Sequence, residues 1–288
     1  MPDSEADLIL ATLALTLLSQ LAFATETPAE GNHVILVLSP QIEKFYTKDS
    51  HGFDEIMKLH GEVFRELEGR RTQRIMINGE NYFIKQHFGV GWKEIIKNLF
   101  QGRLPVLGAK NEWQAISRLQ ALNIRTPEIM GYGCRGKNPA KLQSFLITKE
   151  LLDTISLEDF CRDWKKNPPQ FRTKLNLINE VAKIARVLHE NGMNHRDFYI
   201  CHFLVGDQLC LIDLHRAQIR KKIPLRWQIK DLAGLYFSSK NIGLTQRDLY
   251  RFIKAYTAQP LRDALANQGA LWLKVKLRGE RLYQKHGT

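Results

Sequence analysis

Residues 194–215, NHRDFYICHFLVGDQLCLIDLH, are the stretch of this sequence that is most informative about its fold. They contain two aspartates, Asp197 in an HRD tripeptide and Asp213 in an IDL tripeptide. Between them, HFLV and QLCLIDL predict two short strands joined by a two-residue turn at Gly206-Asp207, because glycine accepts a positive φ without steric cost. Such a hairpin brings the two carboxylates toward one cleft, where one handles a proton and the other holds a metal ion. That is the outline of a phosphoryl-transfer site.

Length and composition indicate a soluble enzyme with a substantial hydrophobic core. The chain has 288 residues, of which 44% are hydrophobic, 25% charged and 9% aromatic, enough for one large domain or two lobes. Its four cysteines are far apart and form no C-x-x-C pair. This spacing argues against a zinc site or a disulfide framework and fits a reducing compartment.

Positive charge is large and unevenly distributed. The formal net charge is +12, yet residues 1–43 contain six acidic residues and no lysine or arginine, which leaves about +18 on the remainder. Such a basic body favours anionic partners: nucleic acid, an anionic membrane surface, or a phosphorylated or acidic substrate. The sequence contains no recognised nucleic-acid-binding motif, so we expect no nucleic acid partner.

The most apolar run of the sequence is LILATLALTLL at residues 8–18. Its flank is acidic where a secretory signal needs positive charge, and eleven residues are too few to span a bilayer comfortably. Three alternatives are a peripheral apolar helix, a weak export signal, or an extension that the folded domain does not need. We favour an extension over residues 1–33, ending in a linker.

After this segment the pattern becomes that of a β-rich domain. Asn-Gly at 78–79 is a strong hairpin signal between RIMI and YFIK. Alternation in the second strand places Tyr82 and Ile84 on the face opposite Phe83 and Lys85. On this pattern alone Lys85 is a solvated charge on an exposed strand face.

Helices are predicted over 53–60, 92–100 and 109–122 from their apolar spacing. Glu112 lies in the first turn of the third helix. It is either a surface carboxylate favoured by the helix dipole or a partner for Lys85.

An apolar strand over 144–152 runs into a connector between two lobes. A helix over 156–164 begins at a serine cap, and a clearer one follows over 171–192, where Gly192 is placed to end it. This second helix leads directly to the HRD tripeptide. Beyond the hairpin we predict a helix that begins at Asp231, and then two more.

A strand lysine, a helix glutamate, HRD, a short hairpin and an apolar-Asp occur in the order that resembles the protein kinase-like fold. Longer strings, including LPVLGAKNEWQAISRL, NHRDFYICHFL and LIDLHRAQIR, resemble the lipopolysaccharide core heptose(I) kinase family over roughly nine tenths of the chain. The resemblance implies an α+β, bilobal fold with a small β-rich N-lobe at 34–150 and a larger helical C-lobe at 151–288.

The resemblance also implies an activity. Enzymes of this family use ATP to phosphorylate a hydroxyl of the first heptose of the lipopolysaccharide inner core, at the cytoplasmic face of the Gram-negative inner membrane. Asp197 would then orient the sugar hydroxyl and accept its proton, and Asp213 would bind Mg²⁺. Lys85, positioned by Glu112, would neutralise the phosphates of ATP.

Two further residues would support this loop in the resembling family, His195 and Asp231. The alternative for Asp231 is a simple carboxylate at a helix N-terminus. His202 stands where protein kinases have a metal-binding asparagine, and it is either a metal ligand or a hydrogen-bonding residue. Leu214-His215 follows the metal aspartate in place of Phe-Gly.

Candidate phosphate and acceptor contacts come from basic residues. The segment 68–71 has one glycine where protein kinases have a Gly-rich loop, so its arginines, Arg70 and Arg71, are candidates for holding the nucleotide phosphates. After the metal aspartate, a basic run supplies candidate acceptor-binding side chains, Arg216, Arg220 and Lys221. They would meet the carboxylates and lipid A phosphates of the inner core, or else form a solvated loop.

Other partners and functions stay open on the sequence alone. Basic charge with exposed aromatics such as Trp227 would support peripheral contact with an anionic membrane surface. Alternative functions are a kinase of another small hydroxylated or aminoglycoside-like substrate, and a catalytically silent kinase-like scaffold that binds an acidic protein. The intact set of Lys85, Glu112, Asp197 and Asp213 argues against a silent scaffold.

Overall fold

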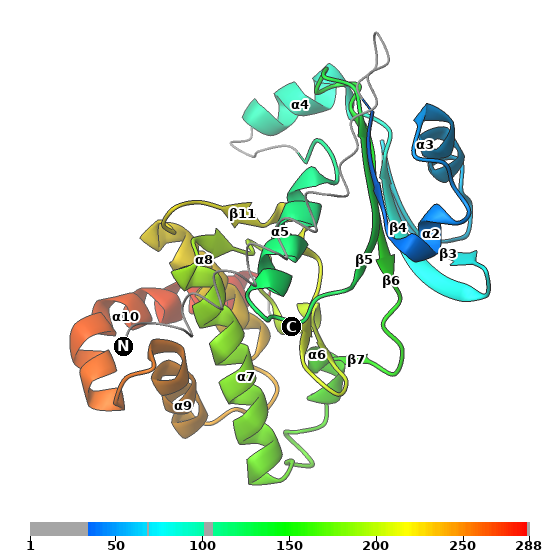
Figure 1. Ribbon diagram of the computed structural model, residues 1–288. Helices are drawn as coiled ribbons and strands as arrows, with labels where there is room; N and C mark the ends of the chain where they lie inside the picture. Colours follow the sequence, from blue (N-terminus) through cyan, green and yellow to red (C-terminus); the bar gives the residue numbers. More distant parts are fainter. Residues whose placement is uncertain (1–33, 68, 101–105, 287–288) are drawn as a thin grey trace, which may run out of the picture. The chain divides into compact units, whose positions relative to one another are not determined.

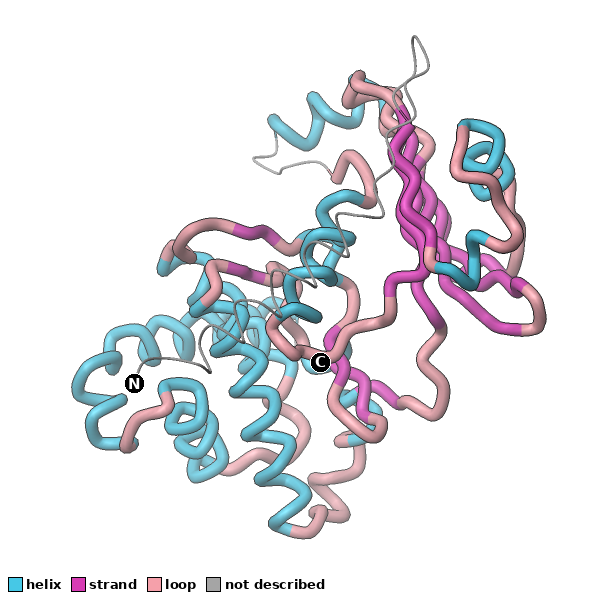
Figure 2. The backbone as a smooth tube through the Cα atoms, viewed as in Figure 1, coloured by secondary structure: helices cyan, strands magenta, loops and turns pink. Residues whose placement is uncertain are grey.

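A computed structural model describes residues 34–67, 69–100 and 106–286, which form two compact units (Figure 1). The first unit consists of the described residues up to Ala121 together with Pro127–Leu151, and the second of Leu122–Thr126 and the described residues from Leu152 onward. Strands dominate the first unit and helices the second (Figure 2). The predicted α+β class is confirmed. The segment predicted as an extension, residues 1–33, lies outside the described residues.

The first unit is built on a six-stranded antiparallel sheet. Its strands, in spatial order, are β1 (Val34–Leu38), β5 (Ile129–Arg135), β6 (Gln143–Lys149), β4 (Glu80–His87), β3 (Arg70–Ile77) and β2 (Glu62–Leu67). Asn78 and Gly79 join β3 to β4, and both have positive φ, at 50° and 80°. The predicted Asn-Gly hairpin is therefore confirmed.

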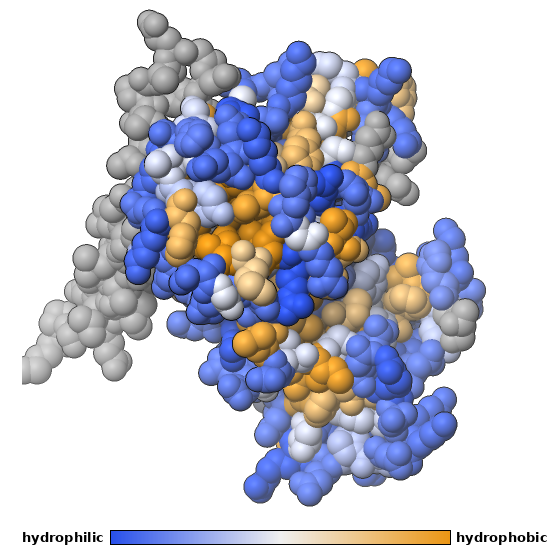
Figure 3. All heavy atoms as spheres, turned by 90° about the vertical axis from the view of Figure 1, so that its right-hand side faces the viewer, coloured by the Kyte–Doolittle hydropathy of each residue, from blue (hydrophilic) through white to orange (hydrophobic). Residues whose placement is uncertain are grey.

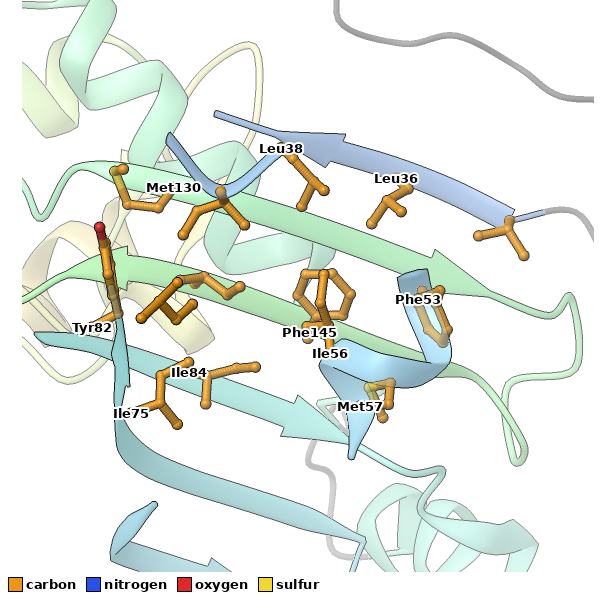
Figure 4. Packing of buried hydrophobic residues seen from close by; sticks show 14 residues of the cluster. Leu36, Leu38, Phe53, Ile56, Met57, Ile75, Tyr82, Ile84, Met130 and Phe145 are labelled. Atoms are coloured by element: carbon orange, nitrogen blue, oxygen red, sulfur yellow. The ribbon is translucent and has the colours of Figure 1, made fainter. Parts of the chain in front are cut away.

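Alternation along β4 separates the two faces of this sheet. Tyr82 and Ile84 are buried in a core that also includes side chains of α2 (Pro40–Glu43) and α3 (Ser50–Met57), as Figure 4 shows. Phe83 and Lys85 face the opposite way, as predicted. The remaining helices of this unit are α4 (Gly91–Phe100) and α5 (Lys110–Ala121).

The helix predicted over 53–60 begins and ends three residues earlier, as α3. Its start is set by Asp49, whose carboxylate accepts hydrogen bonds at 3.0 Å from two backbone N–H groups of the first turn. Its last carbonyls accept from the buried amide of Gln86 on β4, at 3.1 and 3.2 Å. Polar caps, and not the apolar pattern used for the prediction, therefore determine both ends.

The second unit is mainly helical. Its helices are α6 (Leu157–Phe160), α7 (Phe171–Glu190), α8 (Leu225–Ser238), α9 (Gln246–Thr257) and α10 (Leu261–His286). Helix α7 packs against α9, and α8 packs against α10. The apolar stripe that predicts α7 runs from Leu175 to Leu188, and it is buried from Ile178 onward. Helix α6 ends well before residue 164.

Short strands and 3₁₀ turns form much of the segment between α7 and α8, and one of these strands pairs with β7 (Ile155–Ser156), which precedes α6. Strands β7, β9 (Phe203–Val205) and β10 (Cys210–Leu211) form one sheet, and β8 (Met193–Asn194) pairs with β11 (Gln218–Ile219). Two 3₁₀ turns are η1 (Ile200–His202) and η2 (Leu214–Arg216).

The hairpin itself is predicted correctly, but its two-residue turn is wrong. Strand β9 ends at Val205 and β10 begins at Cys210, so four residues connect them. Gly206 has no positive φ, which removes the reason given for the tight turn. Leu209 is buried and draws the chain into the core from a wider loop.

The surface of the described residues is mostly hydrophilic on the face shown in Figure 3, with apolar patches between the polar side chains. Within the described ranges, every helix is too short or too polar to cross a bilayer.

Gly192 should be indispensable at the end of α7. Its φ is +73°, and a Cβ there would lie 1.8 Å from the carbonyl oxygen of Arg220. We expect Gly192→Ala to lower the free energy of unfolding by about 1–3 kcal/mol from backbone strain, with the steric clash in addition. Chemical denaturation measures this. Gly269→Ala, where a Cβ meets nothing within 4 Å, is the matched control and should be neutral or stabilising. Equal effects of the two substitutions on the free energy of unfolding would contradict the requirement for glycine at position 192.

Candidate functional site

Lys85 and Glu112 form an ion pair within the first unit, with Nζ 2.6 Å from Oε1. Glu112 is buried because it lies on the stripe of α5 that also contains Ala115, Ile116 and Leu119. The alternative of a surface carboxylate is therefore wrong. Lys85 keeps 28% of its side chain exposed, so its ammonium is both oriented by a buried carboxylate and accessible to an anion.

In the second unit, the buried carboxylate of Asp231 holds the backbone of the HRD loop, residues 195–197. Asp231 accepts hydrogen bonds from the N–H groups of His195, at 2.6 Å, and Arg196, at 2.8 Å. The prediction that Asp231 begins a helix is wrong, because α8 begins six residues earlier, after Pro224. Its simple helix-terminal alternative is excluded with it, since Asp231 lies mid-helix and has no solvent exposure.

The loop turns sharply at Arg196, whose φ is +76°. A residue with a Cβ adopts this conformation at a cost, and the two hydrogen bonds from the loop to Asp231 hold it in place. The turn directs the next side chain, Asp197, toward Arg216, which donates from Nη1 to both carboxylate oxygens at 3.1 Å. Asp197 thus has a fixed position and a cationic neighbour.

His195 ties the loop to the segment that carries the second aspartate. Its buried ring donates from Nε2 to the carbonyl of Ile212, 3.0 Å away and one residue before Asp213. Burial lowers the pKa of His195, although the nearby Asp231 acts in the opposite direction. The ring is therefore neutral at pH 7 and serves as a structural donor.

His202 and Asp213 converge on one point. His202 donates from Nδ1 to the backbone carbonyl of Asp197 at 2.7 Å. In the neutral ring this leaves the lone pair of Nε2 directed toward the carboxylate of Asp213, 3.5 Å away. Asp213 has a positive φ of 61°, and its other oxygen accepts from Nδ1 of His215 at 2.6 Å.

The carboxylate of Asp213 and Nε2 of His202 fit as two ligands of a divalent cation whose other ligands come from outside the protein. The described residues contain no cluster of three or more His, Cys, Asp or Glu side chains able to hold a metal alone. Mg²⁺ is commonly bound by one or two carboxylates, with substrate phosphates and water completing its octahedron. Asp213 would supply such a carboxylate, and Nε2 of His202 would be a softer second ligand.

The predicted basic side chains have different surroundings. Arg220 donates to Asn194 at 2.7 Å and also bonds Gln218, and Lys221 is exposed. Arg71 donates to Glu66 across the β2–β3 hairpin at 2.7 and 3.0 Å. Trp227, expected to be exposed, is half-buried among cations.

A polar network behind Asp231 was not predicted. His189 lies with Nε2 3.5 Å from Asp231, and its Nδ1 is 2.7 Å from the hydroxyl of Tyr256, which also accepts from Gln228 at 2.7 Å. Burial raises the pKa of Tyr256, which keeps the hydroxyl protonated. In the sequence, the one feature that could have indicated this network is His189, which follows directly on the apolar stripe of α7. A polar side chain at such a position needs buried hydrogen-bond partners.

The chain is similar in sequence and in structure to known proteins. The lipopolysaccharide kinase (Kdo/WaaP) family matches residues 54–256. The lipopolysaccharide core heptose(I) kinase WaaP of Escherichia coli K12 is 52% identical over 242 residues, covering 81% of this chain and 91% of the relative. The enzyme of the same description from Pseudomonas aeruginosa is 47% identical, covering 81% and 90%.

A solved structure described as WaaP in complex with acyl carrier protein is 41% identical to this chain. It superposes with a TM-score of 0.74 and covers 86% of this chain and 99% of its own. A family match over most of the chain, with relatives near half identity, leads to one conclusion: the chain belongs to the lipopolysaccharide kinase (Kdo/WaaP) family and is a kinase.

Proposed function

We propose that this protein transfers the γ-phosphate of ATP to a hydroxyl of the first heptose of the lipopolysaccharide inner core. Its relatives in two bacterial genera are heptose(I) kinases of the lipopolysaccharide core. The observation that carries the proposal is that hydrogen bonds of two buried side chains, Asp231 and His195, connect the segments that bear Asp197 and Asp213.

Asp197 is the residue that meets the acceptor in this proposal. Its carboxylate orients the heptose hydroxyl and accepts the proton as the bond to phosphorus forms, when the hydroxyl becomes acidic. Arg216, bonded to both oxygens of Asp197, holds the carboxylate in one orientation. Arg220 and Lys221 are the other candidate contacts to acceptor anions.

The nucleotide contacts are divided between two groups. Lys85, oriented by Glu112, neutralises phosphate charge. Asp213, with His202 as a second donor, would hold the Mg²⁺ ion. Mg²⁺ held by these residues would supply neutralisation of the negative charge that develops on the nucleotide phosphates.

Partners follow from charge and from the relatives. A net charge of +12 favours anionic surfaces, and the acceptor is an anionic glycolipid. We propose peripheral contact at the cytoplasmic face of the inner membrane, where such a glycolipid is anchored. The solved relative is described as a complex with acyl carrier protein, and we extend that partner to this chain.

Replacing the acceptor-side carboxylate should abolish transfer. We expect Asp197→Asn to lower kcat by about 10²–10⁴, the usual contribution of general acid–base catalysis, with little change in MgATP affinity. The measurement is transfer of labelled γ-phosphate from ATP to inner-core lipopolysaccharide that lacks heptose phosphate. Asp207→Asn, an exposed carboxylate in the neighbouring loop, is the matched control. A folded wild-type protein that binds MgATP but transfers nothing would refute the proposed function.

Replacing the metal carboxylate should have a different effect. We expect Asp213→Asn to weaken ATP binding about tenfold or more when Mg²⁺ is present, and to leave binding in EDTA unchanged, since one carboxylate ligand is lost. Calorimetric titration of ATP, with and without Mg²⁺, separates the two conditions. An unchanged Mg²⁺ dependence in Asp213→Asn would remove Asp213 from the metal site.

A further inference from the structure

Four cationic side chains surround one indole ring in the second unit. The guanidinium carbons of Arg196, Arg226 and Arg220 lie 5.2, 5.3 and 5.9 Å from the ring centroid of Trp227, and the ammonium of Lys230 lies 5.6 Å from it. Each distance is within the range of a cation–π interaction. The indole thus gathers positive charge from the HRD loop, from the end of β11 and from the start of α8.

The carboxylates near this cluster already have ion-pair or hydrogen-bond partners. Asp197 is paired with Arg216, and Asp231 accepts from two backbone N–H groups. Within the described ranges, the side chains of Arg196, Arg226 and Lys230 form no ion pair with a carboxylate. The cluster therefore has more positive charge than its surroundings neutralise.

The pKa values of two members of the cluster are lowered. Burial is the main cause that lowers the pKa of Lys230, and Arg196 and Arg216 lower it further, against the opposing effect of Asp197. Burial, then Arg216 and Arg220, lower the pKa of Arg196, whereas Asp197 and Asp231 act in the opposite direction. A bound anion would relieve this repulsion.

Arg196 is also held in position without being saturated. Its backbone is fixed in the left-handed region by the hydrogen bond to Asp231. Its Nε is buried and has no hydrogen-bond partner among the described residues. A guanidinium that lies against the ring of Trp227 and has a donor without a partner is suited to a planar or tetrahedral oxyanion.

We propose that Arg196, Lys230 and Trp227 form a subsite for an oxyanion carried by the acceptor, beside the hydroxyl that Asp197 receives. This inference rests on the proposed function. The shared chemistry is a phosphate monoester or a sugar carboxylate of the glycolipid. Such a subsite would favour an anionic acceptor over a neutral one. The indole of Trp227 holds the cationic side chains close together, and an anion bound between them would neutralise their charge.

The test compares three acceptors: intact inner-core glycolipid without heptose phosphate, the same after lipid A dephosphorylation, and the same after carboxyl reduction. Wild-type protein should lose about tenfold or more in kcat/KM on one modified acceptor, which identifies the group bound. Lys230→Gln should cause a similar loss with the intact acceptor, mainly through KM. With the acceptor that lacks the recognised group, it should change kcat/KM by less than about twofold.

Lys254 is an exposed lysine on α9, away from the cluster. Lys254→Gln removes the same charge and should leave kcat/KM unchanged with each of the three acceptors. An equal loss in Lys230→Gln with every acceptor, or no loss with any, would overturn the subsite. A change in KM for ATP without a change in KM for the acceptor would also overturn it. Failure of the proposed function is distinct, because wild-type protein would then phosphorylate none of the three acceptors.

Discussion

Asp231 makes the hydrogen bonds on which the rest of the second unit's chemistry depends. A carboxylate with no solvent exposure is expensive to bury unless its oxygens are hydrogen-bonded. Here the backbone N–H groups of His195 and Arg196 satisfy them, and hydrogen bonds to a charged group contribute about 1.5–3 kcal/mol each. The same two bonds hold Arg196 in a strained conformation that the sequence alone would not favour. Stability and loop geometry therefore have one source.

From this anchor, hydrogen bonds extend to both aspartates. His195 bonds the carbonyl before Asp213, the N–H of Ile212 donates to the carbonyl of His202 at 2.9 Å, and the ring of His202 bonds the carbonyl of Asp197. The two carboxylates are thus connected by hydrogen bonds of 2.7–3.0 Å and keep a defined separation. Such pre-organisation is the contribution a protein makes to phosphoryl transfer, where positioning and electrostatics dominate. The cations around Trp227 extend the same logic to the acceptor.

Local patterns predicted most of the elements. Alternation on β4 separated Lys85 from Ile84, and the stripe of α7 identified a core helix, because both depend on side-chain period alone. Element ends failed where a distant polar group decides them, as Gln86 does for α3. For Asp231 the pattern suggested a helix start, because burial of a mid-helix carboxylate depends on backbone donors 35 and 36 residues away. The roles of the site residues came from family resemblance, and the cation cluster required three-dimensional neighbours.

Amide hydrogen exchange at His195 and Arg196, compared between the Asp231→Asn protein and wild type, tests most directly whether Asp231 holds the HRD loop. Asparagine keeps the shape of the side chain but removes the charge and replaces one acceptor oxygen by a donor. If the carboxylate holds the loop, both amides should exchange about 100-fold faster or more in the variant, as expected from the loss of about 3 kcal/mol. Amides of Ile184 and Ala185 in α7 should keep their protection. Unchanged exchange at His195 and Arg196 would show that another contact holds the loop and would contradict the central claim.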